Sequence, residues 1–354
     1  MHSFALRSLL LTQICAHAHP HRSLSGLSLI KLNMEIQDLQ TLEKAIESVA
    51  PICSGWALND RVGDLRRLAE ARRRKLMYRE FEIPKRTGGF RKITAPTGKL
   101  KDIQKCLSVI LETYYNAPEC VHGFTHGCSV ASNARKHIGK NYVLNIDIKD
   151  FFPTISYTRI MKSLEEIGFT EELSDIIARI CTIPMWDEQM QMWRHSLPQG
   201  SPASPLLSNI VCKSLDTRLT NLAHRYCLDY SRYADDITFS SNHSVYAKNS
   251  RFIKELEDVV KSCGFTINEK KTRLQKKGSR QEVTGLIIGE KVNTYRQFRK
   301  NLRAAVFHAE TNGCTSKEYN NIMGRISYLS MVRGKDDSMS KKFAATMSKV
   351  TILR

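Results

Sequence analysis

Residues 230–240 read YSRYADDITFS, two runs of strand-favouring residues on either side of Ala234-Asp235-Asp236. Aromatic and β-branched residues favour strands, and a short polar segment between two such runs is typical of a hairpin turn. The pattern predicts a β-hairpin with two carboxylates at its tip. Taken alone, an Asp-Asp pair is more often a plain polar turn, so the rest of the chain has to decide between the two interpretations.

A second acidic strand end lies upstream, where residues 142–148 read YVLNIDI and the apolar run reaches Asp147. Neighbouring strands lie about 4.8 Å apart, so aspartates on two of them can share a pair of metal ions. Phosphodiester formation uses two Mg²⁺ ions roughly 3.5–4 Å apart. Because Mg²⁺ keeps water and substrate phosphates as ligands, few protein carboxylates suffice. Asp147, Asp235 and Asp236 are therefore candidate ligands of two Mg²⁺ ions.

Segments in which apolar residues have helical spacing lie before, between and after these strands in the sequence. This spacing predicts helices within residues 34–76 and at residues 100–115, 157–181, 204–224 and 252–263. Residues 81–96 predict another hairpin, around the turn Gly88-Gly89. The order of strand, helices, hairpin, helix and strand predicts an α+β fold, an antiparallel sheet with helices on one face.

The chain is strongly basic, with 54 Lys and Arg against 35 Asp and Glu and a net charge of +19 over 354 residues. A polyanion such as nucleic acid is the expected partner, although a basic surface without a partner is the plainer alternative. No stretch approaches the roughly 20 apolar residues of a spanning helix, so we expect no membrane.

The 10 cysteines show neither a CxxC motif nor zinc-finger spacing with His. They are typical of reduced thiols, which favours a cytoplasmic protein. Residues 1–33 superficially resemble a short signal peptide, but Arg7 interrupts the apolar run. We interpret residues 1–33 as an N-terminal extension and expect the folded protein to begin near Met34.

The order of these motifs resembles reverse transcriptases. YADD at residues 233–236 is similar to their YxDD box, NIDIKDFF at 145–152 to their first carboxylate motif, and LPQGSPASP at 197–205 to the loop between them. GFTIN at 264–268 with Lys271-Thr272 resembles the next motif. Within the family the chain resembles bacterial retron enzymes, whose NAxxH and VTG elements match NARKH at 133–137 and VTG at 283–285.

The resemblance implies a right-hand polymerase fold with fingers, palm and a short helical thumb. It divides the chain into N-terminal helices and fingers at residues 34–140, a palm at 141–283, and a primer grip and thumb at 284–354. It also implies that Asp147 and Asp235 bind both metals, that Asp236 lies nearer the primer end, and that the carbonyl of Ile148 completes the shell.

The nucleotide-binding residues follow from the same resemblance. Phe152 matches the aromatic gate against a ribose 2′-hydroxyl, Lys85 and Arg91 flank a fingers hairpin that closes on the triphosphate, Gln199-Gly200 holds the template-nucleotide pair, and Lys271 neutralises the departing pyrophosphate. Each has a plainer alternative: a core aromatic for Phe152, solvated charges for the three cations, and a structural turn for Gln199-Gly200.

The resemblance further implies RNA contacts at the two retron elements, through Asn133, His137, Val283, Thr284 and Gly285, with local hydrogen bonding as the alternative for His137. Downstream, the spacing i, i+3, i+4, i+7 places one group of cations on a single helical face. These cations repel each other unless a phosphate backbone neutralises them, although such a stripe is usually only solvated. The group is Arg296, Arg299, Lys300 and Arg303.

A retron enzyme, by resemblance, copies a structured noncoding RNA (msr-msd) from dNTPs, starting at a guanosine 2′-hydroxyl. The product is msDNA, a branched RNA-DNA hybrid whose template a host RNase H trims, and an accessory effector protein gives the system a role in phage defence. Two alternatives stay open: another class of reverse transcriptase, intron-derived or defence-associated, and an RNA-binding scaffold with an inactive site.

Overall fold

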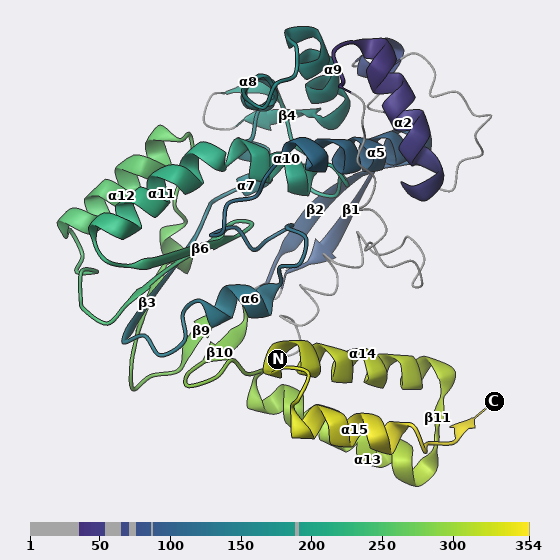
Figure 1. Ribbon diagram of the computed structural model, residues 1–354, viewed down its shortest axis with the longest axis vertical. Coiled ribbons are helices and arrows are strands. Elements are labelled where there is room, and N and C mark those ends of the chain that lie inside the picture. Colours follow the sequence, from purple (N-terminus) through teal and green to yellow (C-terminus); the bar gives the residue numbers. More distant parts are fainter. Residues whose placement is uncertain (1–34, 54–64, 71–75, 86–87, 188–190, 354) are drawn as a thin grey trace.

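A computed structural model describes residues 35–53, 65–70, 76–85, 88–187 and 191–353. The predicted extension, residues 1–33, lies outside this range. At the centre is a four-stranded sheet in the order β6-β7-β3-β8, drawn in the middle of Figure 1. All its neighbouring strands are antiparallel. The strands are β3 (Tyr142–Asp147), β6 (Asp229–Tyr233), β7 (Asp236–Ser241) and β8 (Arg273–Lys276).

The two faces of this sheet are covered differently. Leu144 and Ile146 of β3 pack into the large core, on the side where α11 (Lys213–Arg225) and α12 (Arg251–Ser262) lie. Val143 points to the other face, since side chains alternate along a strand. It packs against α6 (Val130–Arg135) and the hairpin of β9 (Gln281–Val283) and β10 (Leu286–Ile288). The predicted α+β class is confirmed. The second face of the sheet is partly covered by α6 and the β9–β10 hairpin.

The fingers side is built on an antiparallel hairpin, β1 (Tyr78–Pro84) and β2 (Phe90–Pro96), in which Tyr78 faces Pro96. Helices α2 (Leu39–Cys53) and α5 (Gly98–Tyr114) pack beside it in the same core as the palm helices. One continuous core therefore joins the fingers side to the palm. The remaining elements before β6 are α3 (Leu65–Ala69), α7 (Phe151–Thr154), α8 (Tyr157–Glu166), α9 (Glu171–Cys181), β4 (Ile183–Asp187), β5 (Met192–Ser196) and α10 (Ser204–Val211).

The segment predicted as helical at 157–181 is two helices, and the break has a local cause. Gly168 adopts a φ of +108° between α8 and α9, a backbone conformation that favours glycine. Thr170 then caps α9 by accepting a hydrogen bond from the Leu173 N–H. The turn-and-cap pair lets α9 fold back along α8.

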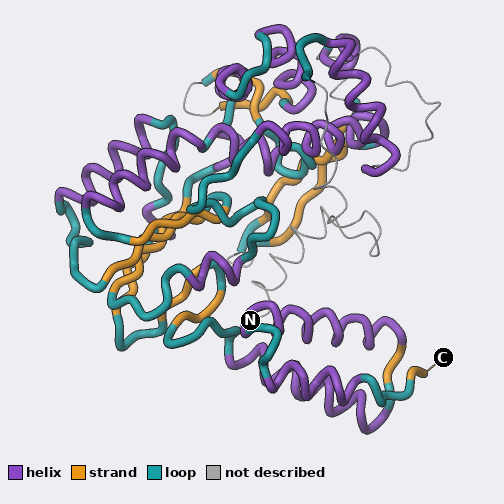
Figure 2. The backbone as a smooth tube through the Cα atoms, viewed as in Figure 1, coloured by secondary structure: helices purple, strands orange, loops and turns teal. Residues whose placement is uncertain are grey.

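The C-terminal helices form a separate bundle with a small core of its own. Figures 1 and 2 show α13 (Arg296–Asn312), α14 (Ser316–Arg333) and α15 (Ser338–Met347) beside the β9–β10 hairpin. A capping box between Thr315 and Glu318 starts α14. Two short parallel strands, β11 (Cys314–Thr315) and β12 (Ile352–Leu353), tie the C-terminal end to the bundle. The division of the chain at residues 34, 141 and 284 stays a prediction.

None of the helices in the described part of the chain combines the length and the apolar character needed to cross a bilayer.

Candidate active site

Three aspartates lie at one end of the central sheet. Asp147 ends β3 directly opposite Asp236, the first residue of β7, and directly opposed Cα atoms in antiparallel strands are about 4.5–5.5 Å apart. Asp235 lies in the turn before β7, and its carbonyl accepts a hydrogen bond of 3.0 Å from the Ile148 N–H. The structure thus brings together the aspartates that the sequence singled out.

Asp147 already has a cationic neighbour. Lys271 Nζ lies 2.8 Å from both carboxylate oxygens, and Asn268 Nδ2 donates to Oδ1 at 3.0 Å. The Asn268 N–H also donates to the Asp147 carbonyl at 2.8 Å, so η2 (Glu269–Lys271) begins beside the site. The Asp147 side chain is 11% exposed and that of Lys271 50%. Lys271 is therefore the member of the pair that is free to swing into solvent.

The turn that carries Asp235 has a fixed backbone. Ala234 has a φ of +57°, a left-handed conformation that non-glycine residues seldom adopt. Its carbonyl accepts a hydrogen bond of 3.2 Å from Arg232 Nη1. A Cβ added to Gly123 would lie 2.4 Å from the Ala234 nitrogen, so the backbone at residue 123 is pressed against the turn.

The donor set matches the chemistry of Mg²⁺, because carboxylate oxygens from two strands are hard ligands at one edge. As the side chains stand, no group of three or more His, Cys, Asp and Glu residues in the described part of the chain forms a ready metal site. Binding would require Lys271 to leave Asp147, and incoming phosphate oxygens would complete the shell. Asp147, Asp235, Asp236 and the Ile148 carbonyl are the groups that would hold the metal.

The order of these elements matches a known family. Residues 83–289, more than half of the chain, match the family described as reverse transcriptase (RNA-dependent DNA polymerase). The chain belongs to the reverse transcriptase family.

Several of its relatives are retron enzymes. It is 33% identical over 262 residues to the retron Ec86 reverse transcriptase of Escherichia coli, covering 73% of this chain and 77% of that one. It is 32% identical over 291 residues to the retron Mx65 reverse transcriptase of Myxococcus xanthus, covering 78% and 66%. The chain thus spans just under two thirds of the Mx65 protein. Within the family it belongs with the retron reverse transcriptases.

Among solved structures, telomerase from Candida albicans in complex with a telomeric RNA fragment aligns with a TM-score of 0.43 and 12% identity. The alignment covers 77% of this chain and 63% of that one.

In this reverse transcriptase the predicted gate, Phe152, lies just beyond the carboxylates. Phe151 is buried and stacks on Phe265 with ring centroids 5.8 Å apart. Phe152 is half-buried and approaches Phe124 at 6.3 Å. Asp150, with a φ of +46°, directs the chain into this short helix. The neighbouring phenylalanines therefore have different surroundings, and Phe152 is the one with exposed surface.

Gln199 and Gly200 connect the palm to the fingers. The Gln199 carbonyl accepts a hydrogen bond of 2.8 Å from the Thr94 N–H of β2. Gly200 has a φ of +126°, and an added Cβ would lie 2.8 Å from Ile93 Cγ2. Glycine is thus required both by its backbone conformation and by the close approach of β2.

Lys85 and Arg91 lie at the tip of the fingers hairpin. The Lys85 N–H donates to the Gly89 carbonyl at 2.8 Å, and Arg91 pairs with Ile83. Lys85 is exposed and Arg91 half-buried. Contact of either side chain with a triphosphate stays a prediction.

The RNA contacts predicted at the two retron elements require a correction. Asn133, His137 and Val283 are 0% exposed, so none of them can contact RNA in this structure. His137 hydrogen-bonds through Nδ1 to Ser240 Oγ and through Nε2 to Ser231 Oγ, both at 2.7 Å. Burial, with neighbouring lysines adding a smaller effect, lowers the pKa of His137 to about 3. The local hydrogen bonding that the sequence left as an alternative is what the structure has.

Thr284 and Gly285 form the tip of the β9–β10 hairpin. Their φ angles are +46° and +77°, as a two-residue primed turn requires. Thr284 Oγ1 donates to the carbonyl of Val130, the first residue of α6, at 3.1 Å. The NAxxH and VTG elements therefore pack on each other and on the back of the palm sheet.

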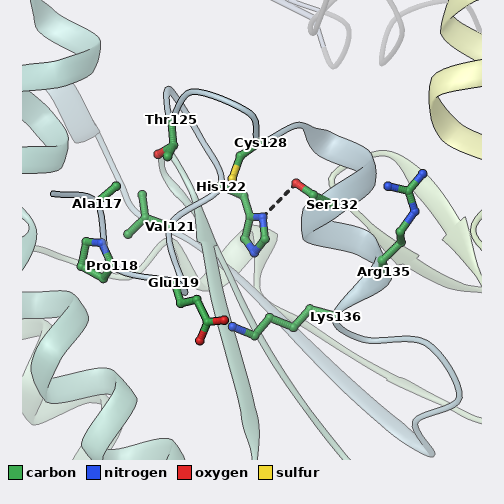
Figure 3. A pocket seen from close by; sticks show the side chains of 10 residues that line it. All are labelled: Ala117, Pro118, Glu119, Val121, His122, Thr125, Cys128, Ser132, Arg135 and Lys136. Carbon is green, nitrogen blue, oxygen red and sulfur yellow. Dashed lines mark hydrogen bonds between the residues drawn. The ribbon is translucent and has the colours of Figure 1, made fainter. Parts of the chain in front are cut away.

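The two variable positions of NAxxH are accessible to solvent, unlike Asn133 and His137. Arg135 is exposed and Lys136 half-buried, and both line a pocket of about 500 Å³ beside α6. Figure 3 shows His122 at its centre, hydrogen-bonded through Nδ1 to Ser132 Oγ at 2.9 Å. Arg135 Nη2 also donates to the Met331 carbonyl of α14 at 2.9 Å. The NAxxH motif does not single out Arg135 or Lys136, because it leaves both positions unspecified.

The four cations of α13 do not share one environment. Arg296, Lys300 and Arg303 are exposed. Arg299 is half-buried and donates to Asn293 Oδ1 at 2.8 Å and to the Thr294 carbonyl. Burial, followed by the charges of Arg333, Arg296 and Arg303, lowers the pKa of Arg299. Arg299 thus fastens the start of the helix, and the three exposed cations remain the candidates for phosphate contacts.

Proposed function

We propose that this chain is the RNA-directed DNA polymerase of a retron. The single observation that carries the proposal is the pairing of Asp147 with Asp236 across β3 and β7, with Asp235 in the adjoining turn. Membership of the retron branch supports the choice of RNA as template and DNA as product. The cofactor would be a pair of Mg²⁺ ions.

When bound, the metals would lower the pKa of the primer hydroxyl and stabilise charge on the leaving pyrophosphate. The chain's own residues would place the reactants. Asp147 and Asp235 would hold the metals, and Asp236 would lie nearer the primer end. Phe152 would close off the ribose 2′ position of the incoming dNTP, and the Gln199–Gly200 turn would keep the template-nucleotide pair in register.

Charge around the leaving group would come from mobile cations. Lys271 would be released from Asp147 when the metals bind and would then face the pyrophosphate, while Lys85 and Arg91 would approach the triphosphate from the fingers hairpin. Once in place, positive charge near developing negative charge lowers the barrier most where water is excluded.

We further propose that the template is a cognate structured noncoding RNA (msr-msd), primed from a guanosine 2′-hydroxyl and copied into msDNA. The exposed cations Arg296, Lys300 and Arg303 of α13 would contact its phosphates, since each such contact releases counterions and strengthens binding. By family resemblance, a host RNase H would trim the template, and an accessory effector protein would join the complex in phage defence in the cytoplasm.

The test is primer extension on an RNA template with dNTPs and Mg²⁺, followed by sequencing of the nucleic acid that copurifies with the protein. Extension that is lost in Asp235→Asn and Asp236→Asn variants supports the polymerase. A branched RNA-DNA copurifying with the chain supports the retron assignment. Extension without such a product points to another reverse transcriptase class, and RNA binding without extension to an inactive scaffold.

A further inference from the structure

A buried ion pair lies directly beneath the candidate catalytic turn. Arg232 of β6 and Asp216 of α11 are both 0% exposed. Arg232 Nε donates to Asp216 Oδ1 and Nη2 donates to Oδ2, each at 2.7 Å. Tyr230 adds a third donor to this carboxylate at 2.7 Å. The guanidinium plane is therefore fixed by a two-point contact from a helix behind the sheet.

The remaining guanidinium nitrogen points at the turn. Arg232 Nη1 donates to the Ala234 carbonyl at 3.2 Å and to Asn209 Oδ1 at 3.1 Å. Asn209 in turn donates through Nδ2 to the Gly123 carbonyl at 2.9 Å. The carbonyl just before Asp235 is thus held by a side chain whose own orientation is set elsewhere.

The turn is confined from its other sides as well. Gly123 packs against the Ala234 nitrogen, where an added Cβ would come within 2.4 Å. The Ile148 N–H donates to the Asp235 carbonyl at 3.0 Å. The edge of β6 is covered, because the Arg232 N–H donates to the Cys120 carbonyl and the Arg232 carbonyl accepts from His122. Displacement of the turn would therefore break several of these contacts together.

We propose that Arg232, oriented by Asp216, is a positioning residue that fixes the Ala234–Asp235 backbone so that Asp235 faces Asp147 before metal and substrate bind. The inference deepens the proposed polymerase function and rests on it for its catalytic consequence.

A contribution to stability alone would not explain the pair. A buried ion pair is often no more stable than apolar residues of similar volume. Apolar side chains, however, cannot donate to the Ala234 carbonyl. Lysine has the charge but lacks the planar fork that contacts Asp216 and the turn at the same time. The directional hydrogen bonds are what only arginine supplies at this position.

Two variants separate positioning from folding. Arg232→Lys keeps the charge and removes the fork. Arg232→Met combined with Asp216→Leu removes both charges together, so no unpaired charge is left in the core and the protein is expected to fold. Asp229→Asn is the matched control, because it breaks the ion pair with Lys140 at the opposite end of β6. The control leaves the turn untouched.

Two readouts are needed, only one of which depends on catalysis. In primer extension we expect kcat to fall about 100-fold in both Arg232 variants with little change in KM for dNTP, since an error of about 1 Å at a reacting group costs that much. By hydrogen exchange we expect the Ile148 amide, which the turn protects, to exchange faster in both variants. Exchange in α14 should stay at the parental rate, as should every readout in Asp229→Asn.

The proposal is overturned if the folded double variant has the parental kcat, or if Ile148 exchange is parental in both Arg232 variants. Failure of the proposed function gives a different result. If the parental chain does not extend primers, Ile148 exchange alone decides whether Arg232 positions the turn: faster exchange in both variants supports it and equal exchange refutes it.

Discussion

The carboxylate cluster and the two retron elements are both short motifs, yet the structure uses their residues in opposite ways. Asp235 and Asp236 are half-exposed at the end of a sheet, where a metal and a substrate can reach them. Asn133, His137 and Val283 are completely buried. A motif match therefore locates important residues without saying whether they contact a ligand or hold the residues that do.

The two regions are also connected. His137 joins Ser231 of β6 to Ser240 of β7, and these are the strands that carry the aspartate turn. Arg135, two positions earlier, reaches the end of α14 in the C-terminal bundle. The retron element thus acts as framework between the palm hairpin and the thumb, and mutation should affect the two regions in different ways.

The largest effect is expected at the carboxylates. Asp235→Ala should lower primer-extension kcat by at least about 1,000-fold, because charge stabilisation by the metals is worth several kcal/mol. The melting temperature should stay near the parental value, since Asp235 lies in a turn. Asp258→Ala, an exposed aspartate on α12, is the control. A large fall in the melting temperature of Asp235→Ala would contradict the expected difference between the two regions.

The opposite behaviour is expected at His137. His137→Ala should lower the free energy of unfolding by about 2–4 kcal/mol, because it leaves a cavity and removes the partner of two buried hydroxyls. Denaturant unfolding measures this loss. RNA affinity of the folded variant should equal the parental affinity. A large loss of RNA affinity at unchanged stability would restore the interpretation of His137 as an RNA contact.

The pH dependence sharpens the same point. The folded pKa of His137 is about 3, below its ordinary value of 6.5, so the unfolded chain takes up a proton that the folded chain does not. The contribution of His137 to stability is complete above pH 6.5. It should be lost as pH falls toward 3, at up to about 1.4 kcal/mol per pH unit. The free energies of unfolding of the parent and of His137→Gln should be measured from pH 7 to pH 4, and the difference between the two proteins should shrink as the pH falls.

A smaller change is expected at Phe152. Phe152→Ala should reduce the preference for dNTP over NTP by about tenfold, the equivalent of about 1.4 kcal/mol. Phe152→Tyr keeps the ring and should keep the preference. Single-nucleotide incorporation with both substrates measures it. Equal discrimination in the alanine variant would make Phe152 an ordinary core aromatic beside Phe124.

The smallest effect on rate is expected on α13. Replacing Arg296, Lys300 and Arg303 by Gln should leave kcat at saturating RNA unchanged. The slope of log K for RNA binding against log [salt] should become shallower by about 0.7–0.9 for each lost phosphate contact. Replacing Lys162, Lys254 and Lys261, which are exposed on palm helices, is the charge-matched control. An equal loss of salt dependence in both triple variants would mean nonspecific attraction.

The strands and their acidic ends could be predicted because each depends on local signals. The proximity of Asp147 to the turn at residues 235–236 was expected from the resemblance to reverse transcriptases. The turn chemistry of residues 230–240 and the apolar run before Asp147 are visible in short windows of sequence. The α+β class followed from the order of such windows. Helix 157–181 was predicted as one piece because the break depends on the left-handed backbone of Gly168.

What could not be predicted depends on partners distant along the chain. Arg232 looks like an exposed charge on a strand until Asp216 is brought over it from α11. His137 looks like an RNA contact until Ser231 and Ser240 enclose it. Lys271 was predicted to face the pyrophosphate, and nothing in its spacing indicated the pair with Asp147. A buried polar group is satisfied by the tertiary structure, which a single sequence does not display.

The most direct test of the carboxylate site is a crystal structure with an RNA–DNA primer-template, a dNTP and Mn²⁺ in place of Mg²⁺, using anomalous scattering to locate the metal. We predict two Mn²⁺ ions between Asp147 and Asp235, with Lys271 withdrawn from Asp147. An intact Lys271–Asp147 pair in that complex, with no metal at the end of β3 and β7, would contradict the account.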